Sequence, residues 1–184
     1  RPGNYLVFFP GFDYLQSVYI FLGNVDSEIL IQRPRMSEEQ RNNYLQTLKE
    51  EGPHLLLGVT GGIFAEGVDY PGDMAIGVIV ISPSLPAVSY EQEILRGYYD
   101  DVFGLGMEYA YIYPGMNRVI QAVGRLIRTS QDCGVAVLIG ERFAEDAFQD
   151  LLPVHWFREK GDIEITDDYR QAIVEFWEKR STIQ

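Results

Sequence analysis

The stretch Gln121-Ala-Val-Gly-Arg-Leu-Ile-Arg128 decides how this sequence is interpreted. On a helix with about 100° per residue, the polar members of the stretch share one face: Gln121, Gly124, Arg125 and Arg128. The other face is apolar, with Met116, Val119, Ile120, Val123, Leu126 and Ile127. Glycine inside a helix costs about 1 kcal/mol relative to alanine, so we expect another group to approach the backbone closely at Gly124. Guanidinium groups suit phosphate oxygens, so the polar face is either a solvated arginine surface or a phosphate-binding one.

Outside this stretch, short apolar runs alternate with amphipathic stretches, a pattern typical of a mainly parallel β-sheet flanked by helices on both faces. We expect strands at residues 5–9, 28–32, 54–60, 75–81 and 135–139. We expect helices at residues 12–21, 37 to about 50, 90–103, from about 117 through the arginine stretch, and 168–180. Residues 104–115 are expected to be irregular, and Ser37 and Gln40 have the spacing of a capping box. The sequence thus predicts one α/β domain over residues 1–184, with a helical tail from about residue 153.

The charge of the chain limits how it can meet nucleic acid. Its formal net charge is −12, from 15 basic and 27 acidic residues. Proteins that bind nucleic acid with a whole surface usually have a basic excess, so we expect contact through a confined patch only. Arg118, Arg125 and Arg128 form such a patch, which we expect another domain to complete. No apolar run approaches the roughly 20 residues that span a bilayer, so we expect no membrane partner. The single cysteine favours a reducing, cytoplasmic compartment, and the linker-like start at residues 1–4 indicates a piece of a longer polypeptide.

A glycine-rich segment, Thr60-Gly-Gly-Ile-Phe-Ala-Glu-Gly-Val-Asp69, leaves the predicted strand at residues 54–60. Ligands of open parallel sheets bind outside the carboxyl ends of the strands, which is where this segment lies. It is a plain turn, a dinucleotide loop, or a nucleotide or nucleic-acid loop that works with the arginine face. The glycine spacing does not match G-x-G-x-x-G, which disfavours the dinucleotide loop. We favour the third interpretation, because glycines let a backbone approach a ligand and Glu66 and Asp69 add two carboxylates.

The sequence contains no phosphate cradle of its own. A G-x-x-x-x-G-K-[ST] motif is missing, and no acidic cluster is placed to hold magnesium. Arginine fingers, in contrast, are commonly supplied by a neighbouring domain or protein. Cys133 is the only cysteine, and we expect it to be structural, in the turn before the strand at residues 135–139. The chain therefore has the content of half a nucleotide site, with no metal ligands predicted.

Several segments together resemble one helicase family. Gln121-x-x-Gly124-Arg125-x-x-Arg128 resembles motif VI of superfamily 2 helicases. Residues 60–69 resemble motif V of the DinG/XPD-like branch, and residues 4–22 resemble its motif IV region. Residues 109–118 and 134–143 are similar to bacterial DinG-type proteins, and order and spacing agree from about residue 4 to residue 157. The resemblance implies the C-terminal, second RecA-like domain of such a helicase, a P-loop NTPase-like fold without its own P-loop.

What this resemblance implies for the nucleotide is specific. The parent would be an ATP-dependent DNA helicase, moving 5′ to 3′ and linked to DNA repair. A first RecA-like domain of the same polypeptide would hold most of the ATP and Mg²⁺, so this domain alone would hydrolyse ATP negligibly. Arg125 and Arg128 would be catalytic, neutralising charge on the γ-phosphate. The nucleotide side would be lined by Gln121, Gly124, Glu66, Gly67 and Asp69. Many members carry an iron–sulfur cluster in the first domain, to which this chain adds no ligands.

The resemblance also implies a track for single-stranded DNA along Thr60, Gly61, Gly62, Tyr113 and Phe12. Amides and the hydroxyl of the Thr60 turn would face the DNA backbone. Tyr113 is either a base-stacking residue, an interaction worth about 1–3 kcal/mol, or an ordinary packing residue. Family members usually place a serine or threonine with a tyrosine after the motif IV strand. Because Pro10-Gly11-Phe12 stands there instead, a hydroxyl–phosphate contact is not expected at this turn.

Two other functions compete with the motor domain. One is a non-enzymatic RecA-like scaffold for repair partners, which the acidic tail would contact. The other is a stand-alone nicotinamide-binding domain, which the glycine spacing disfavours. For the motor domain we expect a cytoplasmic location, associated with the nucleoid in a bacterium, or a nuclear location in a eukaryote.

Overall fold

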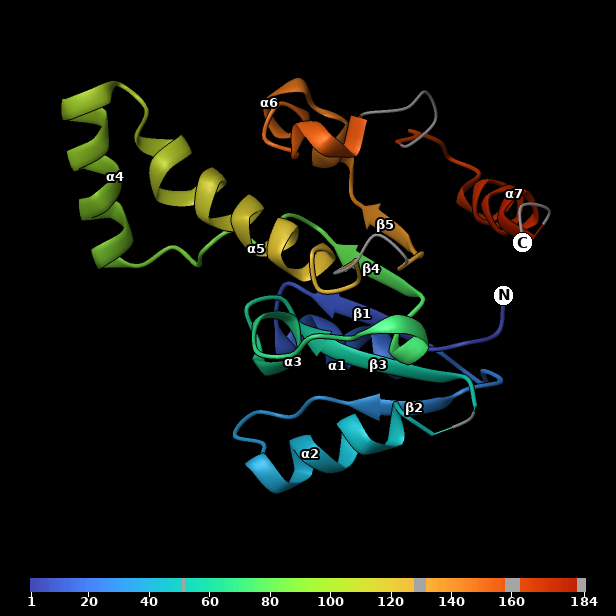
Figure 1. Ribbon diagram of the computed structural model, residues 1–184. Helices are drawn as coiled ribbons and strands as arrows, with labels where there is room; N and C mark the ends of the chain where they lie inside the picture. The colour runs from blue at the N-terminus through green and yellow to red at the C-terminus, as the bar shows by residue number, and fades with distance from the viewer. Residues whose placement is uncertain (51, 128–131, 158–162, 182–184) are drawn as a thin grey trace.

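The chain folds around a parallel β-sheet (Figure 1). The computed structural model describes residues 1–50, 52–127, 132–157 and 163–181, and in them the sheet has five strands in the order β2-β3-β1-β4-β5. The strands are β1 (Tyr5–Phe9), β2 (Glu28–Ile31), β3 (His54–Val59), β4 (Gly77–Ile81) and β5 (Val135–Ile139). Every pairing is parallel, so the carboxyl ends of all five strands lie at one edge of the sheet.

Helices alternate with these strands along the chain. The α-helices are α1 (Phe12–Tyr19), α2 (Glu38–Thr47), α3 (Ile63–Glu66), α4 (Tyr90–Phe103), α5 (Tyr113–Val123), α6 (Asp146–Gln149) and α7 (Tyr169–Ser181). The 3-10 helices are η1 (Gly72–Met74), η3 (Glu141–Ala144) and η4 (Val154–Phe157), and η2 (Glu108–Ile112) is a π-helix. The predicted α/β class is confirmed, and every predicted strand is present with its ends within two residues of the expected ones.

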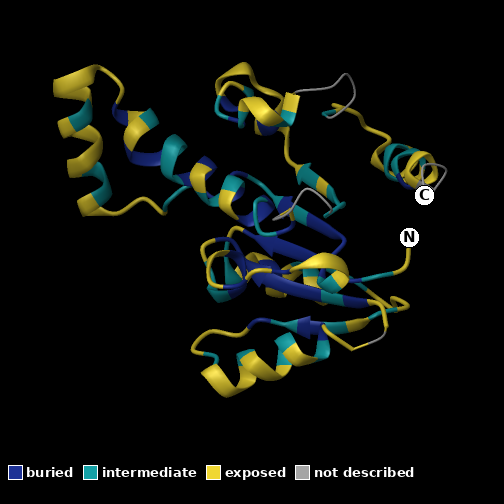
Figure 2. Cartoon of the chain, in the orientation of Figure 1, coloured by how far each residue is buried: buried dark blue, intermediate teal, exposed yellow. Residues whose placement is uncertain are grey.

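The sheet has a core on each face, because β1 and β4, and β3 after His54, are continuous apolar runs. In β1, Leu6 and Phe8 belong to the larger core, together with buried residues of α3 and α5. Val7 and Phe9 belong to the smaller core, where Leu15 of α1 packs against them. Figure 2 shows the central strands as buried, with exposed residues on the outer surfaces of the helices. The predicted covering of both faces is therefore confirmed.

The tyrosine-rich segment differs from the prediction. Residues 104–115 were expected to be irregular, but η2 runs through them and α5 already begins at Tyr113, with a proline in its first turn. Aromatic packing explains the order, since Tyr109 stacks on Tyr99 and Phe103 of α4 with ring centroids 5.0 and 5.2 Å apart. The Tyr111 hydroxyl also donates to Glu93 at 2.6 Å. Contacts between α4 and this segment, which periodicity does not reveal, make it helical.

The arginine stretch also differs, because α5 ends at Val123 rather than continuing to residue 128. The amides of Arg125 and Leu126 donate to carbonyls three residues back, at 3.3 and 3.0 Å, which tightens the chain into a turn. Gly124 is the residue that ends the helix, with φ −64° and ψ −9°. Within the described residues, a Cβ on Gly124 would meet only carbonyls of its own helix, so no other protein group approaches the backbone there.

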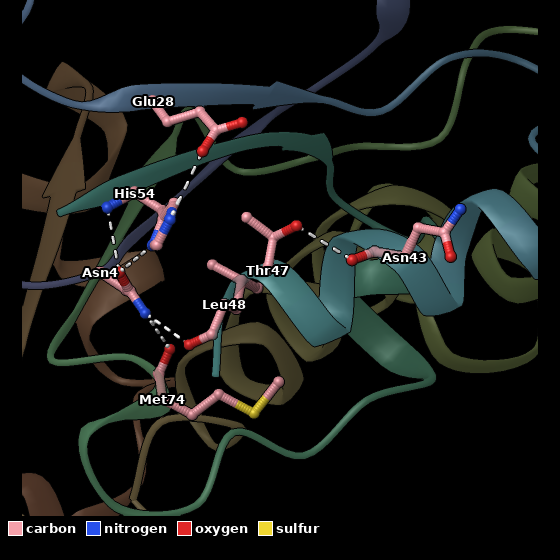
Figure 3. Close-up of polar contacts among 7 residues, drawn as sticks. All are labelled: Asn4, Glu28, Asn43, Thr47, Leu48, His54 and Met74. Atoms are coloured by element: carbon pink, nitrogen blue, oxygen red, sulfur yellow. Dashed lines mark hydrogen bonds and ion pairs between the residues drawn. The ribbon is translucent and has the colours of Figure 1, made fainter. Parts of the chain in front are cut away.

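A buried asparagine ties four segments together at the amino edge of the sheet (Figure 3). The Asn4 side chain is 4% exposed, and its Nδ2 donates to the carbonyls of Leu48 and Met74 at 2.8 and 3.1 Å. Its Oδ1 accepts from the backbone amide of His54 at 3.0 Å and lies 2.9 Å from the His54 ring Nδ1. One side chain thus joins the start of β1 to α2, η1 and β3.

We expect Asn4→Ala to lower the free energy of unfolding by about 2–3 kcal/mol, because it leaves buried polar groups without partners. Chemical denaturation with urea measures the change. Asn43→Ala is the matched control: Asn43 is exposed on α2, and its carbonyl still accepts from Thr47 after the substitution. The control should stay within about 0.5 kcal/mol of the parent. Equal stability of the two variants would show that the Asn4 contacts do not hold the amino edge.

Candidate functional site

Three turns meet at the carboxyl edge of the sheet, where ligands of parallel sheets bind. They follow β1, β2 and β3, and they line a shallow cavity of about 330 Å³. Phe12 contributes from the first turn, Arg33 and Arg35 from the second, and residues 60–62 from the third. The structure therefore brings Phe12 and the predicted Thr60 turn together, as expected for one surface.

The glycine turn after β3 is shaped by tight packing. Gly61 has φ +79°, in the left-handed region that favours glycine. A Cβ on Gly62 would lie 2.7 Å from Nε2 of Gln32 and 2.8 Å from the carbonyl oxygen of Val59. Gln32 is 5% exposed and accepts from the Val59 amide at 3.1 Å, so it cannot easily move away. This turn tolerates only glycine at residue 62.

The polar groups of this turn are only partly available to a ligand. The Thr60 side chain donates to the Phe9 carbonyl at 3.3 Å, and the residue is 8% exposed. The Thr60 and Gly62 amides also donate within the fold, to the carbonyls of Phe9 and Val59. The exposed Gly61 amide makes no hydrogen bond within the described part of the chain. Gly61 is the exposed residue of this turn, and its amide, unlike the Thr60 hydroxyl, has no partner among the described residues.

Arg125 joins the arginine stretch to the glycine-rich segment. Its Nη1 donates to Oδ1 of Asp69 at 2.8 Å, and its Nη2 donates to the carbonyl of Glu66. The Arg125 side chain is 24% exposed, compared with 58% for Asp69. The sequence predicts a guanidinium presented to phosphate, whereas in this structure Arg125 is already held by two groups. A guanidinium has five N–H donors, so the two contacts leave others for a ligand.

Two residues that the sequence interpretation did not single out support the same segment. The buried Tyr70 hydroxyl donates to the Phe64 carbonyl at 2.9 Å, and burial raises the pKa of this hydroxyl well above its usual range. Tyr70 therefore acts as a neutral brace inside the loop. From α2, Arg41 donates to the carbonyl of Gly67 at 3.4 Å. The Tyr70 bond fixes the shape of residues 64–70, and the Arg41 bond ties this segment to α2.

The remaining predicted residues are spread along α5 and beyond it. Gln121 is exposed on the last turn of α5, and Gly124 ends that helix. Arg128 lies outside the described residues. Tyr113 is in the first turn of α5 and contacts Tyr109 edge-to-face, with ring centroids 5.0 Å apart. Tyr113 does not line the cavity beside Phe12, so the structure places it in an aromatic cluster instead.

Arginines beside the glycine turn complete this edge. Arg118 of α5 would lie 3.5 Å, at its Cδ and Nε, from a Cβ on Gly61, and its Nη1 donates to the Ser84 carbonyl at 3.4 Å. Arg33 and Arg35 are exposed at the rim of the cavity. Sequence reasoning noted Arg118 but missed Gln32, Arg33 and Arg35. Their position directly after a predicted strand was the signal that could have found them.

No group of three or more histidine, cysteine, aspartate or glutamate side chains that could hold a metal ion occurs among the described residues. Cys133 is a free cysteine just before β5, in the turn where the sequence places it. In the portion of the chain that the structure describes, every helix is too short or too polar to cross a membrane. The polar groups described around this site are arginine guanidiniums, carboxylates and backbone amides.

A five-stranded parallel sheet flanked by helices, with Arg125 joining the arginine stretch to the glycine-rich segment after β3, is the arrangement of RecA-like domains. The family model described as "Helicase C-terminal domain" matches residues 1–160. The chain therefore belongs to the helicase C-terminal domain family. A solved structure of an XPD helicase has the same fold, with a TM-score of 0.65 at 20% identity over 80% of this chain and 26% of that one.

Curated relatives agree with this membership. The chain is 32% identical over 164 residues to a probable ATP-dependent helicase of Methanocaldococcus jannaschii, covering 78% of this chain and 24% of that protein. It is 28% identical over 181 residues to the ATP-dependent DNA helicase CHL1 of Debaryomyces hansenii, covering 86% of this chain and 22% of that protein. The chain thus spans about a quarter of the length of these relatives.

Two glycine substitutions test the packing of the turn after β3. Gly62→Ala should lower the free energy of unfolding by about 1–3 kcal/mol, because the new methyl overlaps Gln32 and a backbone carbonyl. Gly97→Ala, on the exposed surface of α4 with no atom within 4 Å of the new Cβ, should raise it by about 0.5–1 kcal/mol. Urea denaturation of both variants gives the comparison. A Gly62→Ala variant as stable as the parent would contradict the tight approach of Gln32.

Proposed function

We propose that this chain is the second motor domain of an ATP-dependent DNA helicase of the DinG/XPD-like type. A first RecA-like domain of the same polypeptide holds ATP, and this domain closes the nucleotide site from the other side. The observation that carries the proposal is the contact of Arg125 with Asp69 and with the Glu66 carbonyl. It connects the arginine turn to the loop beside the proposed DNA surface. The family membership supports the proposal.

In this proposal the chain supplies positive charge but not the metal site. The described residues offer no cluster suited to Mg²⁺, so ligands for Mg²⁺ with ATP come from the first domain. Arg128, which lies outside the described residues, and the remaining donors of Arg125 neutralise charge on the γ-phosphate during transfer. Gln121 and Gly124, near the same turn, border the nucleotide. Glu66 and Asp69 hold the turn in place from the facing loop, and with Gly67 they line the nucleotide side.

The loop from Thr60 to Asp69 is the proposed link between nucleotide and DNA. Its first residues form the glycine turn at the cavity, and its last residues hold Arg125. The short helix α3 lies between them and buries Phe64 and Ala65 in the core. Because this segment is short and packed, a shift of Arg125 toward phosphate moves the glycine turn as well. Single-stranded DNA is the proposed ligand of that turn, with Phe12 beside it and Tyr113 a more remote contact.

The direction of movement and the biological role are further parts of the proposal. Movement from 5′ to 3′ and a role in DNA repair follow from the resemblance to DinG/XPD-like helicases. The DNA helicases named among the relatives support a DNA rather than RNA substrate. A nucleoid-associated or nuclear location follows from the same substrate.

Arginine substitutions in the full-length protein test the nucleotide role. We expect Arg125→Ala to lower kcat for DNA-stimulated ATP hydrolysis by about 10³-fold, since arginine fingers contribute about 10³–10⁵. We expect Arg128→Ala to do the same. Arg125→Lys should recover little, because lysine cannot hold Asp69 and a carbonyl with one planar fork. Arg142→Ala, at an exposed arginine of η3, is the control and should keep the parent kcat. Turnover near the parent value in Arg125→Ala and Arg128→Ala would overturn the proposal.

Asp69→Asn in the full-length protein tests the link to DNA. The asparagine keeps the shape of the side chain but removes the charge that holds Arg125. We expect the rate without DNA to fall little and the stimulation by single-stranded DNA to fall by about 5–100-fold, the usual range of coupling between sites. Asp73→Asn is the control. Asp73 is an exposed carboxylate of η1 that lies 3.7 Å from the Arg1 guanidinium, and its substitution should leave stimulation unchanged. Unchanged stimulation in Asp69→Asn would show that the loop does not couple the sites.

A further inference from the structure

The turn between β2 and α2 carries two arginines in a fixed conformation. Arg33 and Arg35 flank Pro34, and Arg35 has φ +57°, a left-handed conformation that costs a residue with a Cβ about 1–3 kcal/mol. The turn is held at both ends. Gln32 is buried against β3 on one side, and on the other side Ser37 and Gln40 form a capping box that starts α2, with bonds of 3.0 and 3.2 Å. A strained, well-anchored backbone on a surface turn is a feature associated with binding.

These two side chains are free positive charges in an acidic chain. Both are exposed, and neither forms an ion pair or a side-chain hydrogen bond with any residue that the structure describes. Arg41, Arg96 and Arg125, in contrast, all have protein partners. In a chain with a net charge of −12, two unpaired guanidiniums side by side favour an external anion.

The position of this turn relates it to the glycine turn. Arg33, Arg35 and Gly61 line the same cavity at the carboxyl edge, together with Phe12. The exposed Gly61 amide is a neutral donor at the same surface, and Arg118 lies beside Gly61. In Figure 1 the segment after β2 and the segment after β3 lie at the same edge of the sheet. The cavity therefore has positive charge on one rim and a backbone donor on the other.

We propose that Arg33 and Arg35 bind neighbouring phosphates of single-stranded DNA as it passes the Gly61 amide. This inference rests on the proposed DNA-motor function. The Cα atoms of residues two positions apart, such as Arg33 and Arg35, are at most about 7 Å apart. This separation is comparable with that of neighbouring phosphates on an extended single strand. Arginine contacts to phosphate position a nucleic acid without reading its sequence. The two arginines therefore supply positive charge for the DNA track in a domain whose overall charge opposes DNA binding.

The salt dependence of DNA binding tests this role in the full-length protein. Anisotropy of a fluorescein-labelled oligothymidylate, without ATP, gives the binding constant across a KCl series. Each neutralised phosphate on a single strand contributes about 0.7 to the slope of log binding constant against log salt concentration. Arg33→Ala/Arg35→Ala should therefore make this slope shallower by about 1.4 and weaken binding. Arg33→Lys/Arg35→Lys keeps both charges and should keep the slope.

The control removes two positive charges elsewhere. Lys49 follows α2 and lies with Gly3 and Asn4 at the amino edge of the sheet. Arg180 is exposed in α7, whose Trp177 ring lies 5.0 Å from the Arg1 guanidinium. Lys49→Ala/Arg180→Ala changes the net charge equally and should leave the slope as in the parent. The control could also lose as much slope as Arg33→Ala/Arg35→Ala. The effect would then come from net charge alone, and the proposal would be overturned.

The remaining outcomes separate this inference from the motor function. If the parent protein binds the oligonucleotide but Arg33→Ala/Arg35→Ala keeps its slope, the two arginines are not phosphate contacts and the inference fails alone. If the parent does not bind the oligonucleotide, the DNA-motor function fails with it. If the double variant raises KM for ATP in the absence of DNA and leaves the slope unchanged, the turn binds nucleotide phosphate, which also overturns the inference. If Arg33→Lys/Arg35→Lys loses as much slope as Arg33→Ala/Arg35→Ala, the arginines have a structural role, and the inference is overturned.

Discussion

The contact of Arg125 with Asp69 and Glu66 is the constraint that gives this edge of the molecule its form. It joins residues 56 positions apart and places the end of α5 against the loop after β3. A partly exposed ion pair is worth only about 0–1 kcal/mol, so its effect is on position more than on stability. The stability comes from the two cores on the faces of the sheet, and the contact fixes where the turns lie on that body.

Charge is distributed so that a strongly acidic chain still offers local sites for anions. The acidic residues outnumber the basic ones by 27 to 15, yet Arg33, Arg35 and Arg118 lie near the glycine turn at the carboxyl edge, and Arg125 lies against the loop after β3. They differ in how they are held. Arg125 and Arg118 donate to protein groups, whereas Arg33 and Arg35 face outward. This division suits a surface with one structural set of arginines and one set for a ligand.

The sequence predicted the sheet well because its strands are uninterrupted apolar runs, as in β1, where the predicted and observed ends coincide. It predicted the start of α2 because a capping box is a local signal. It failed for η2 and the start of α5, where stacking of Tyr109 on α4 decides the structure. It placed the glycine-rich loop directly after β3, as the structure does, but it did not predict the pairing of Arg125 with Asp69. That pairing depends on a helix ending early and on contacts between distant segments, which helical periodicity does not contain.

The hydrogen bonds that hold Arg125 against Asp69 and Glu66 also bear on how the proposed motor responds to nucleotide. A guanidinium near the surface of a domain without its nucleotide would otherwise face water, and Asp69 supplies a counter-charge at 2.8 Å. In the proposed motor, a γ-phosphate in the closed cleft binds the remaining donors of Arg125 and draws the guanidinium away from Asp69. Any weakening of the Asp69 contact then loosens the loop that leads back to Gly61. In the proposed motor, this movement of Arg125 is a physical route from nucleotide binding to the DNA surface.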